Sequence, residues 1–117
     1  PLIVSGESLP EKKTAGNSLF TREIDNVRVK GREQPTTLFE VMNNNPQDIL
    51  EKKIQSMPIY EEGLSHYKKG KFQDAINCFI ECVKICPQDE IPGIYLRRCS
   101  TLLRVPPGAD WTGVSTL

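Results

Sequence analysis

A short β-hairpin near the start of the chain is the feature that most constrains the fold. Apolar and charged residues alternate over residues 22–30, and a similar alternation covers residues 36–41, which predicts two strands. Gly31 permits the positive φ of a tight turn, and Pro35, which lacks an N–H, suits the start of an edge strand. Two strands alone are marginal in water, so the hairpin must pack on a larger sheet.

The residues before the hairpin supply little of that larger sheet. The apolar run at residues 2–4 is typical of the end of a buried strand, residues 7–13 predict a short helix, and residues 14–17 predict a loop. Because these strands are too few for a complete sheet, we expect the remaining strands to lie upstream of Pro1.

Helical periodicity dominates the second half. The pattern starts at Asp48, and Pro58 predicts a break or a new first turn. A polar turn at residues 69–71 separates two helices, Pro87 ends the second, and residues 94–104 form a third. We therefore predict an α+β chain. Its expected parts are a β portion at residues 1–43, a linker and helix at 44–58, a helical segment at 59–105 and a tail at 106–117.

Charge and composition exclude several functions. The 15 basic and 15 acidic residues balance, which gives no electrostatic case for nucleic acid or an anionic membrane. No run approaches the roughly 20 apolar residues of a membrane span. The opening has no signal peptide and no initiator Met, so we expect a cytoplasmic piece of a longer or processed protein. His66 is the one histidine, which disfavours nucleophilic catalysis and indicates a surface or interhelical residue.

Four cysteines lie in the helical half, three of them four residues apart, at positions 78, 82, 86 and 99. Thiols on successive turns of one helix do not suit a disulfide framework, and we expect them to be reduced. Thiolates bind zinc, but the short-spaced CxxC pairs typical of structural zinc sites are missing. The spacing therefore favours small buried hydrophobes over ligands, and we predict no metal bound by this chain.

Residues 56–89 carry a pattern in which small, aromatic and turn residues recur at fixed spacing. Small residues suit a close helix crossing, aromatic residues fill the space between helices, and glycine and proline suit a turn and a helix end. The residues that carry the pattern are Gly63, Tyr67, Gly70, Phe72, Ala75, Ile76, Phe79 and Pro87. The pattern resembles one tetratricopeptide unit of 34 residues, although Glu62 stands where that family usually has leucine.

A single unit of this kind cannot bury its faces alone, because stable arrays need about three repeats. We expect residues 95–103 to form a capping helix, with Tyr95, Leu96, Cys99 and Leu102 facing inward. The resemblance implies binding of a protein partner, packing within the same protein, or a dimer contact. We favour the last two over a peptide groove.

Two motifs mark the β portion: REID at residues 22–25, and VRVKG at residues 27–31 followed by Pro35. With the opening stretch PLIVSGES, they resemble the C-terminal end of the class III adenylate/guanylate cyclase catalytic domain, over about residues 1–42. The resemblance implies that the hairpin is the last piece of a cyclase-type α/β sandwich.

The resemblance continues into the helices. Bacterial cyclases of this class, including cyanobacterial ones, often continue into a tetratricopeptide-like tail with a Tyr-Leu-x-Arg-Cys stretch and an Asp-Trp-x-Gly-Val end. This chain has YLRRC at residues 95–99 and DWTGV at residues 110–114. The helices are then the C-terminal appendix of the cyclase domain.

Such cyclases convert ATP to cyclic AMP and diphosphate as homodimers, with two Mg²⁺ or Mn²⁺ ions held by paired aspartates. The resemblance places those aspartates, and the residues that orient the ribose and distinguish the purine, before Pro1. It implies no catalytic residue within this chain, which we expect to be inactive alone. Asp25 does not belong to the family's metal motifs. The lysine of VKG, here Lys30, is implied to contact the triphosphate, with Arg28 as a weaker candidate.

Two other interpretations remain open. The chain is alternatively a tetratricopeptide-type interaction or dimerisation module without catalysis, or a remnant with no present function. Nucleotide binding that depends on Lys30 would distinguish the cyclase interpretation from the module. A solvated lysine on an exposed strand edge is the simplest alternative to a phosphate contact.

Overall fold

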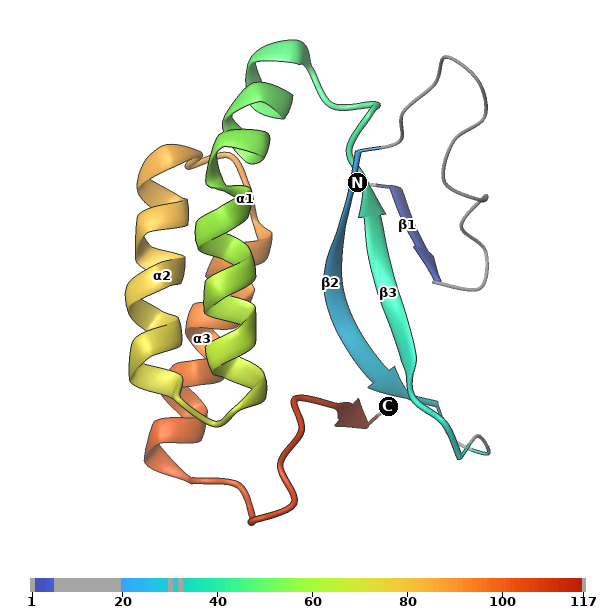
Figure 1. The fold of residues 1–117 in the computed structure, drawn as a ribbon, viewed down its shortest axis with the longest axis vertical. Coiled ribbons are helices and arrows are strands. Elements are labelled where there is room, and N and C mark those ends of the chain that lie inside the picture. The colour runs from blue at the N-terminus through green and yellow to red at the C-terminus, as the bar shows by residue number, and fades with distance from the viewer. Residues whose placement is uncertain (1, 6–19, 30, 32, 117) are drawn as a thin grey trace. The chain divides into compact units, whose positions relative to one another are not determined.

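The computed structural model describes residues 2–5, 20–29, 31 and 33–116, which form three helices and four strands (Figure 1). The prediction of an α+β fold is confirmed. The chain divides into two compact units, one of Pro1–Pro46 with Val114–Leu117, and one of Gln47–Gly113. Within the described residues, no helix combines the length and the apolar character that crossing a bilayer requires.

The first unit is a four-stranded sheet in the order β1-β3-β2-β4. The predicted hairpin is confirmed: β2 covers Thr21–Arg28, β3 covers Thr36–Val41, and the two pair antiparallel. The predicted first strand is β1, Leu2–Ser5, which pairs antiparallel with β3. The predicted helix at residues 7–13 and loop at 14–17 lie outside the described residues.

Strand β4, Ser115–Thr116, comes from the segment predicted as a tail and pairs parallel with the end of β2. Val27 lies opposite Ser115, and Arg28 lies opposite Thr116. Two residues are too short a run to show the alternation that identifies a strand in sequence. The sheet therefore gains an edge that local pattern did not predict.

A bulge changes which side chains of β2 are buried. Glu23 lies opposite Phe39 and Asp25 lies opposite Leu38, so Ile24 is the extra residue between them. Ile24 and Val27 are buried, whereas Val29, just beyond the strand, is exposed. The strand ends at Arg28, so the alternation that the sequence shows over residues 22–30 continues beyond the strand itself.

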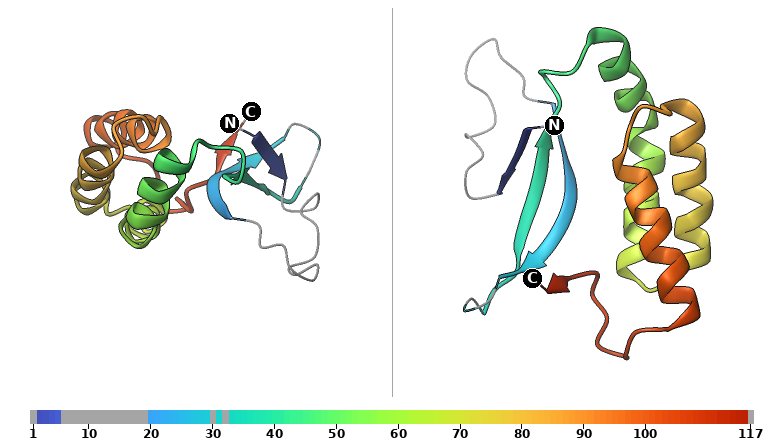
Figure 2. Two further views of the ribbon diagram at one scale, coloured as in Figure 1. Left: turned by 90° about the horizontal axis from the view of Figure 1, so that it is seen from above. Right: turned by 180° about the vertical axis from the view of Figure 1, so that it is seen from behind.

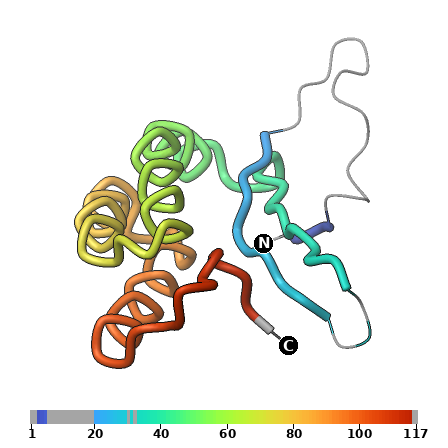
Figure 3. The backbone as a smooth tube through the Cα atoms, turned by 60° about the horizontal axis from the view of Figure 1, so that its bottom comes forward, coloured from blue at the N-terminus to red at the C-terminus, as the bar shows by residue number. Residues whose placement is uncertain are grey.

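The second unit consists of three helices: α1, Gln47–Lys68; α2, Phe72–Ile85; and α3, Ile91–Arg104. They lie side by side (Figure 2), and two short connections join them (Figure 3). The turn after α1 contains Gly70 at φ +78°, a conformation that L side chains rarely adopt. The predicted polar turn at residues 69–71 and the end of α2 before Pro87 are both confirmed.

Two helix boundaries differ from the prediction. The break expected at Pro58 is wrong, because α1 continues through it. Ser56 and Tyr60 are both buried on either side of Pro58, and this packing offsets the loss of one backbone hydrogen bond. Helix α3 starts at Ile91, earlier than expected, since Pro92 occupies its first turn, where no intrahelical N–H is needed.

An aromatic core holds the helices together. Phe79 stacks on Tyr95 with ring centroids 5.1 Å apart, and Tyr60 meets both rings edge-on. Tyr95 and Cys99 of α3 are buried, and Leu96 and Leu102 pack against the same cluster, as predicted for a capping helix. These contacts make one continuous core across all three helices.

Trp111, after α3, also belongs to this core. Its ring lies edge-on to Tyr67 at 5.3 Å and to Phe72 at 5.6 Å. Its indole Nε1 donates a 2.7 Å hydrogen bond to the Tyr67 carbonyl oxygen. The segment after α3 is therefore anchored on the end of α1 by one packed and hydrogen-bonded side chain.

Candidate functional site

The hairpin tip carries the residues that sequence analysis proposed for phosphate binding. Lys30, the main candidate, lies outside the described residues. Arg28, the weaker candidate, is the last residue of β2 and is exposed. Gly31 adopts φ +89°, and a Cβ built on it would meet no heavy atom of the described residues within 4 Å. The exposed guanidinium of Arg28 is accessible to an anionic ligand.

A buried ion pair fixes the two strands that lead to this tip. Arg22 Nη2 lies 2.7 Å from Glu40 Oε1, and Arg22 Nε donates to the same oxygen at 2.9 Å. The two residues are directly opposite in the antiparallel register, and both side chains are 1% exposed. This pair was not predicted from the sequence, although opposite charges at matching strand positions would have indicated it.

Asp25 is half-buried in β2, and its Oδ1 accepts a 2.9 Å hydrogen bond from the Asn26 backbone N–H. Among the described residues, it joins no group of side chains placed to share a metal ion. A single carboxylate is a poor magnesium site.

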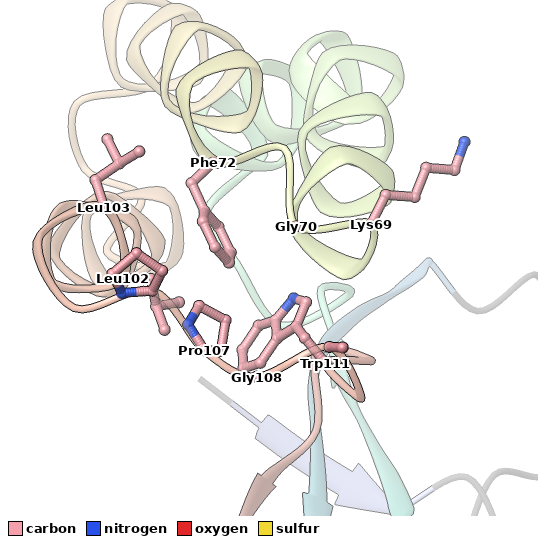
Figure 4. A pocket seen from close by; sticks show the side chains of 10 residues that line it. Lys69, Gly70, Phe72, Leu102, Leu103, Pro107, Gly108 and Trp111 are labelled. Carbon is pink, nitrogen blue, oxygen red and sulfur yellow. The ribbon is translucent and has the colours of Figure 1, made fainter.

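The helical unit contains a pocket of about 450 Å³. Figure 4 shows Phe72, Leu102, Pro107 and Trp111 around it, while the Lys69 side chain extends away. The lining is therefore mostly apolar. An apolar pocket of this kind suits an apolar side chain or ligand.

The residues proposed for helix packing all belong to the helical unit. A Cβ on Gly63 would lie 3.0 Å from Cys78 Cβ and 3.1 Å from the Phe79 ring, so α1 and α2 cross closely there. Ala75, Phe79 and the aromatic residues of the pattern are buried in the core. The proposed packing residues in that core are Tyr67, Phe72, Ala75 and Phe79.

None of the four cysteines forms a disulfide. Cys82, Cys86 and Cys99 are fully buried, which confirms their interpretation as small core hydrophobes, and Cys78 is half-buried. Burial raises the pKa of the Cys99 thiol from 9.0 to about 11, against the opposing charge of Arg98. A shift of that size lowers the thiolate population near neutral pH about 100-fold, so this thiol is not an activated nucleophile.

Cys78 lies in a small polar cluster with Glu62 and His66 between α1 and α2. One ligand atom from each of the three side chains lies within 4.8 Å of the others. Burial and the hydrogen bond from the thiol to Glu62 raise the pKa of Cys78 to about 11. This cluster was not predicted from the sequence, although the four-residue spacing of Glu62 and His66 places them on one helix face.

Comparison with known proteins shows a similarity to an adenylate cyclase. The chain is 30% identical over 86 residues to "Adenylate cyclase, terminal-differentiation specific" of Dictyostelium discoideum. The match takes in 74% of this chain but spans only 4% of that protein's length. No family model matches the chain, and no solved structure gives a significant match. The chain is therefore related in sequence to a small part of a much larger adenylate cyclase.

Proposed function

We propose that this chain is the C-terminal part of a class III nucleotidyl cyclase, which converts ATP to cyclic AMP and diphosphate. The sequence similarity to an adenylate cyclase carries this proposal. The REID and VRVKG motifs support it, because they fall on β2 and its exposed end, where the family has a phosphate-contacting lysine.

Exposed apolar side chains on the sheet unit also support the proposal. Ile3 and Phe20 are more than 40% exposed, and Ile24, Val27 and Met42 are its only described buried hydrophobic residues. A sheet with so small a core gains stability by packing on further structure. The rest of a cyclase-type sandwich would cover these side chains.

The catalytic ions of the family do not fit the described residues of this chain. Mg²⁺ and Mn²⁺ prefer several oxygen ligands, whereas the group of described side chains that could share a metal ion offers one carboxylate beside an imidazole and a thiol. On the proposal, the ions and the transition-state residues belong to the parent enzyme, and this chain alone forms no cyclic AMP. Its contribution is a positive charge at the hairpin tip for the triphosphate.

Lys30→Ala is expected to abolish measurable ATP binding by the chain. A hydrogen bond to a charged group contributes about 1.5–3 kcal/mol, so its loss weakens binding by at least about tenfold. Titration of ATP and AMP into isotope-labelled chain, followed by amide chemical shifts, measures the affinity. Wild type should bind ATP weakly and AMP less, and Arg28→Ala should have a smaller effect than Lys30→Ala.

Lys71→Ala, which removes an exposed lysine from the helical unit, is the matched control and should leave ATP binding unchanged. The phosphate-contact proposal fails if Lys30→Ala and Lys71→Ala bind ATP equally well. It also fails if AMP binds as tightly as ATP.

A second candidate function is self-association through the helical unit. Leu103, which lines the apolar pocket, is 45% exposed, and Val105, two residues later, is 71% exposed. Because one repeat buries less than a stable array, we propose that a second copy of this chain covers them.

Val105→Asp is expected to raise the dissociation constant of the dimer at least tenfold, as measured by sedimentation. Thr101→Asp, an exposed position on α3, is the control, and equal behaviour of both variants would contradict the proposal.

A further inference from the structure

The crossing of α1 and α2 brings potential metal ligands from both helices together. Gly63 permits the crossing, because any Cβ there would meet Cys78 Cβ at 3.0 Å. Glu62 precedes this glycine, and His66 lies one turn later on α1. The close approach therefore sets the Cys78 thiol of α2 against the face of α1 that carries a carboxylate and an imidazole.

The distances within this cluster match shared coordination. Cys78 Sγ lies 3.4 Å from Glu62 Oε2. Two ligands bound tetrahedrally at typical zinc–sulfur and zinc–oxygen lengths lie about 3.5 Å apart. All three ligand atoms are within 4.8 Å of one another, so small side-chain rotations would complete a three-ligand set.

The imidazole gives a second, independent indication. His66 Nδ1 is buried and has no hydrogen-bond partner among the described residues. A buried polar atom without a partner is costly, and such atoms in native structures commonly mark a bound water or ion. A cation shared with the neighbouring carboxylate and thiol would give the imidazole a polar partner.

We propose that Glu62, His66 and Cys78 bind one divalent cation of the zinc type, with the fourth position open to water. A thiolate and an imidazole favour zinc over magnesium or calcium, which prefer oxygen ligands alone. Glu62 is exposed, so the site opens to solvent on that side. Asp74, one turn before Cys78 on α2, adds nearby negative charge. The bound ion would connect α1 to α2.

This proposal departs from the prediction, made from the cysteine spacing, that the chain binds no metal. That prediction rested on the lack of thiol pairs close together in sequence. The ligands here are a carboxylate and an imidazole on one helix, and a single thiol on the next helix. It also differs from the catalytic ions of the proposed cyclase, and neither proposal depends on the other.

Titration of the chain with Co²⁺, a spectroscopic substitute for zinc, tests the site. Wild type is expected to bind one ion with a thiolate-to-cobalt charge-transfer band, which Zn²⁺ displaces and a large excess of Mg²⁺ does not. Cys78→Ser should remove the band. Glu62→Gln changes an exposed side chain with little risk to folding. It should weaken Zn²⁺ binding at least tenfold, as measured by calorimetry.

Glu61→Gln is the matched control, because Glu61 is the exposed neighbour of Glu62 on the same helix. It should bind Zn²⁺ like wild type. Zn²⁺ should also raise the unfolding temperature of wild type and Glu61→Gln, but not that of Glu62→Gln. The proposal is overturned if wild type gives no charge-transfer band, if Cys78→Ser retains it, or if Glu62→Gln and Glu61→Gln bind Zn²⁺ equally.

Discussion

Arg22→Met is expected to lower the free energy of unfolding of the sheet unit by about 3–5 kcal/mol, because it leaves the Glu40 carboxylate buried without its partner. Both side chains are 1% exposed, so water cannot replace the lost contacts. Urea unfolding, monitored through the amide signals of β2 and β3, measures this loss without interference from the helices. The expected change is a large fraction of the stability of an ordinary domain.

The double variant Arg22→Met/Glu40→Leu is the control for this experiment. Removing both charges replaces a desolvated pair with an apolar pair, which is often neutral or stabilising. Its stability should return to near that of wild type. If the double variant is as unstable as Arg22→Met alone, the loss comes from packing, and the assigned role of the ion pair is wrong.

Phe79→Ala is expected to lower the free energy of unfolding of the helical unit by about 3–5 kcal/mol. Phe79 is fully buried, stacks on Tyr95 of α3 and meets Tyr60 of α1 edge-on, so its ring links all three helices. Loss of the ring removes these contacts and leaves a cavity at the centre of the unit. Helical circular dichroism during urea unfolding measures the effect.

Ile80→Ala gives the comparison, since Ile80 is the next residue on α2 and is 41% exposed. Its truncation should cost less than about 1 kcal/mol. A similar loss from both variants would show that the helices are not held by a common aromatic core.

Local pattern predicted most of the elements of this fold. Alternation found β2 and β3, and Gly70 and Pro87 fixed two of the helix boundaries through backbone chemistry that does not depend on the rest of the chain. The error at Pro58 arose because burial of its neighbours Ser56 and Tyr60 overrides a local helix signal.

Contacts between residues far apart in sequence could not be predicted in this way. The hydrogen bond from Trp111 to Tyr67 joins positions 44 residues apart, and β4 pairs with β2 from the opposite end of the chain. The same limit applies to the candidate metal site, whose thiol meets its partners only when α1 and α2 cross at Gly63. Lys30 came from motif resemblance alone, and its surroundings lie outside the described residues.

Cyclic AMP formation by the intact polypeptide that contains this chain tests the cyclase proposal most directly. We predict that it converts ATP to cyclic AMP with Mg²⁺ or Mn²⁺. We also predict that Lys30→Ala lowers kcat/KM at least about tenfold while Lys71→Ala leaves it unchanged. An intact polypeptide that forms no cyclic AMP, or a Lys30→Ala variant as active as Lys71→Ala, would contradict this account.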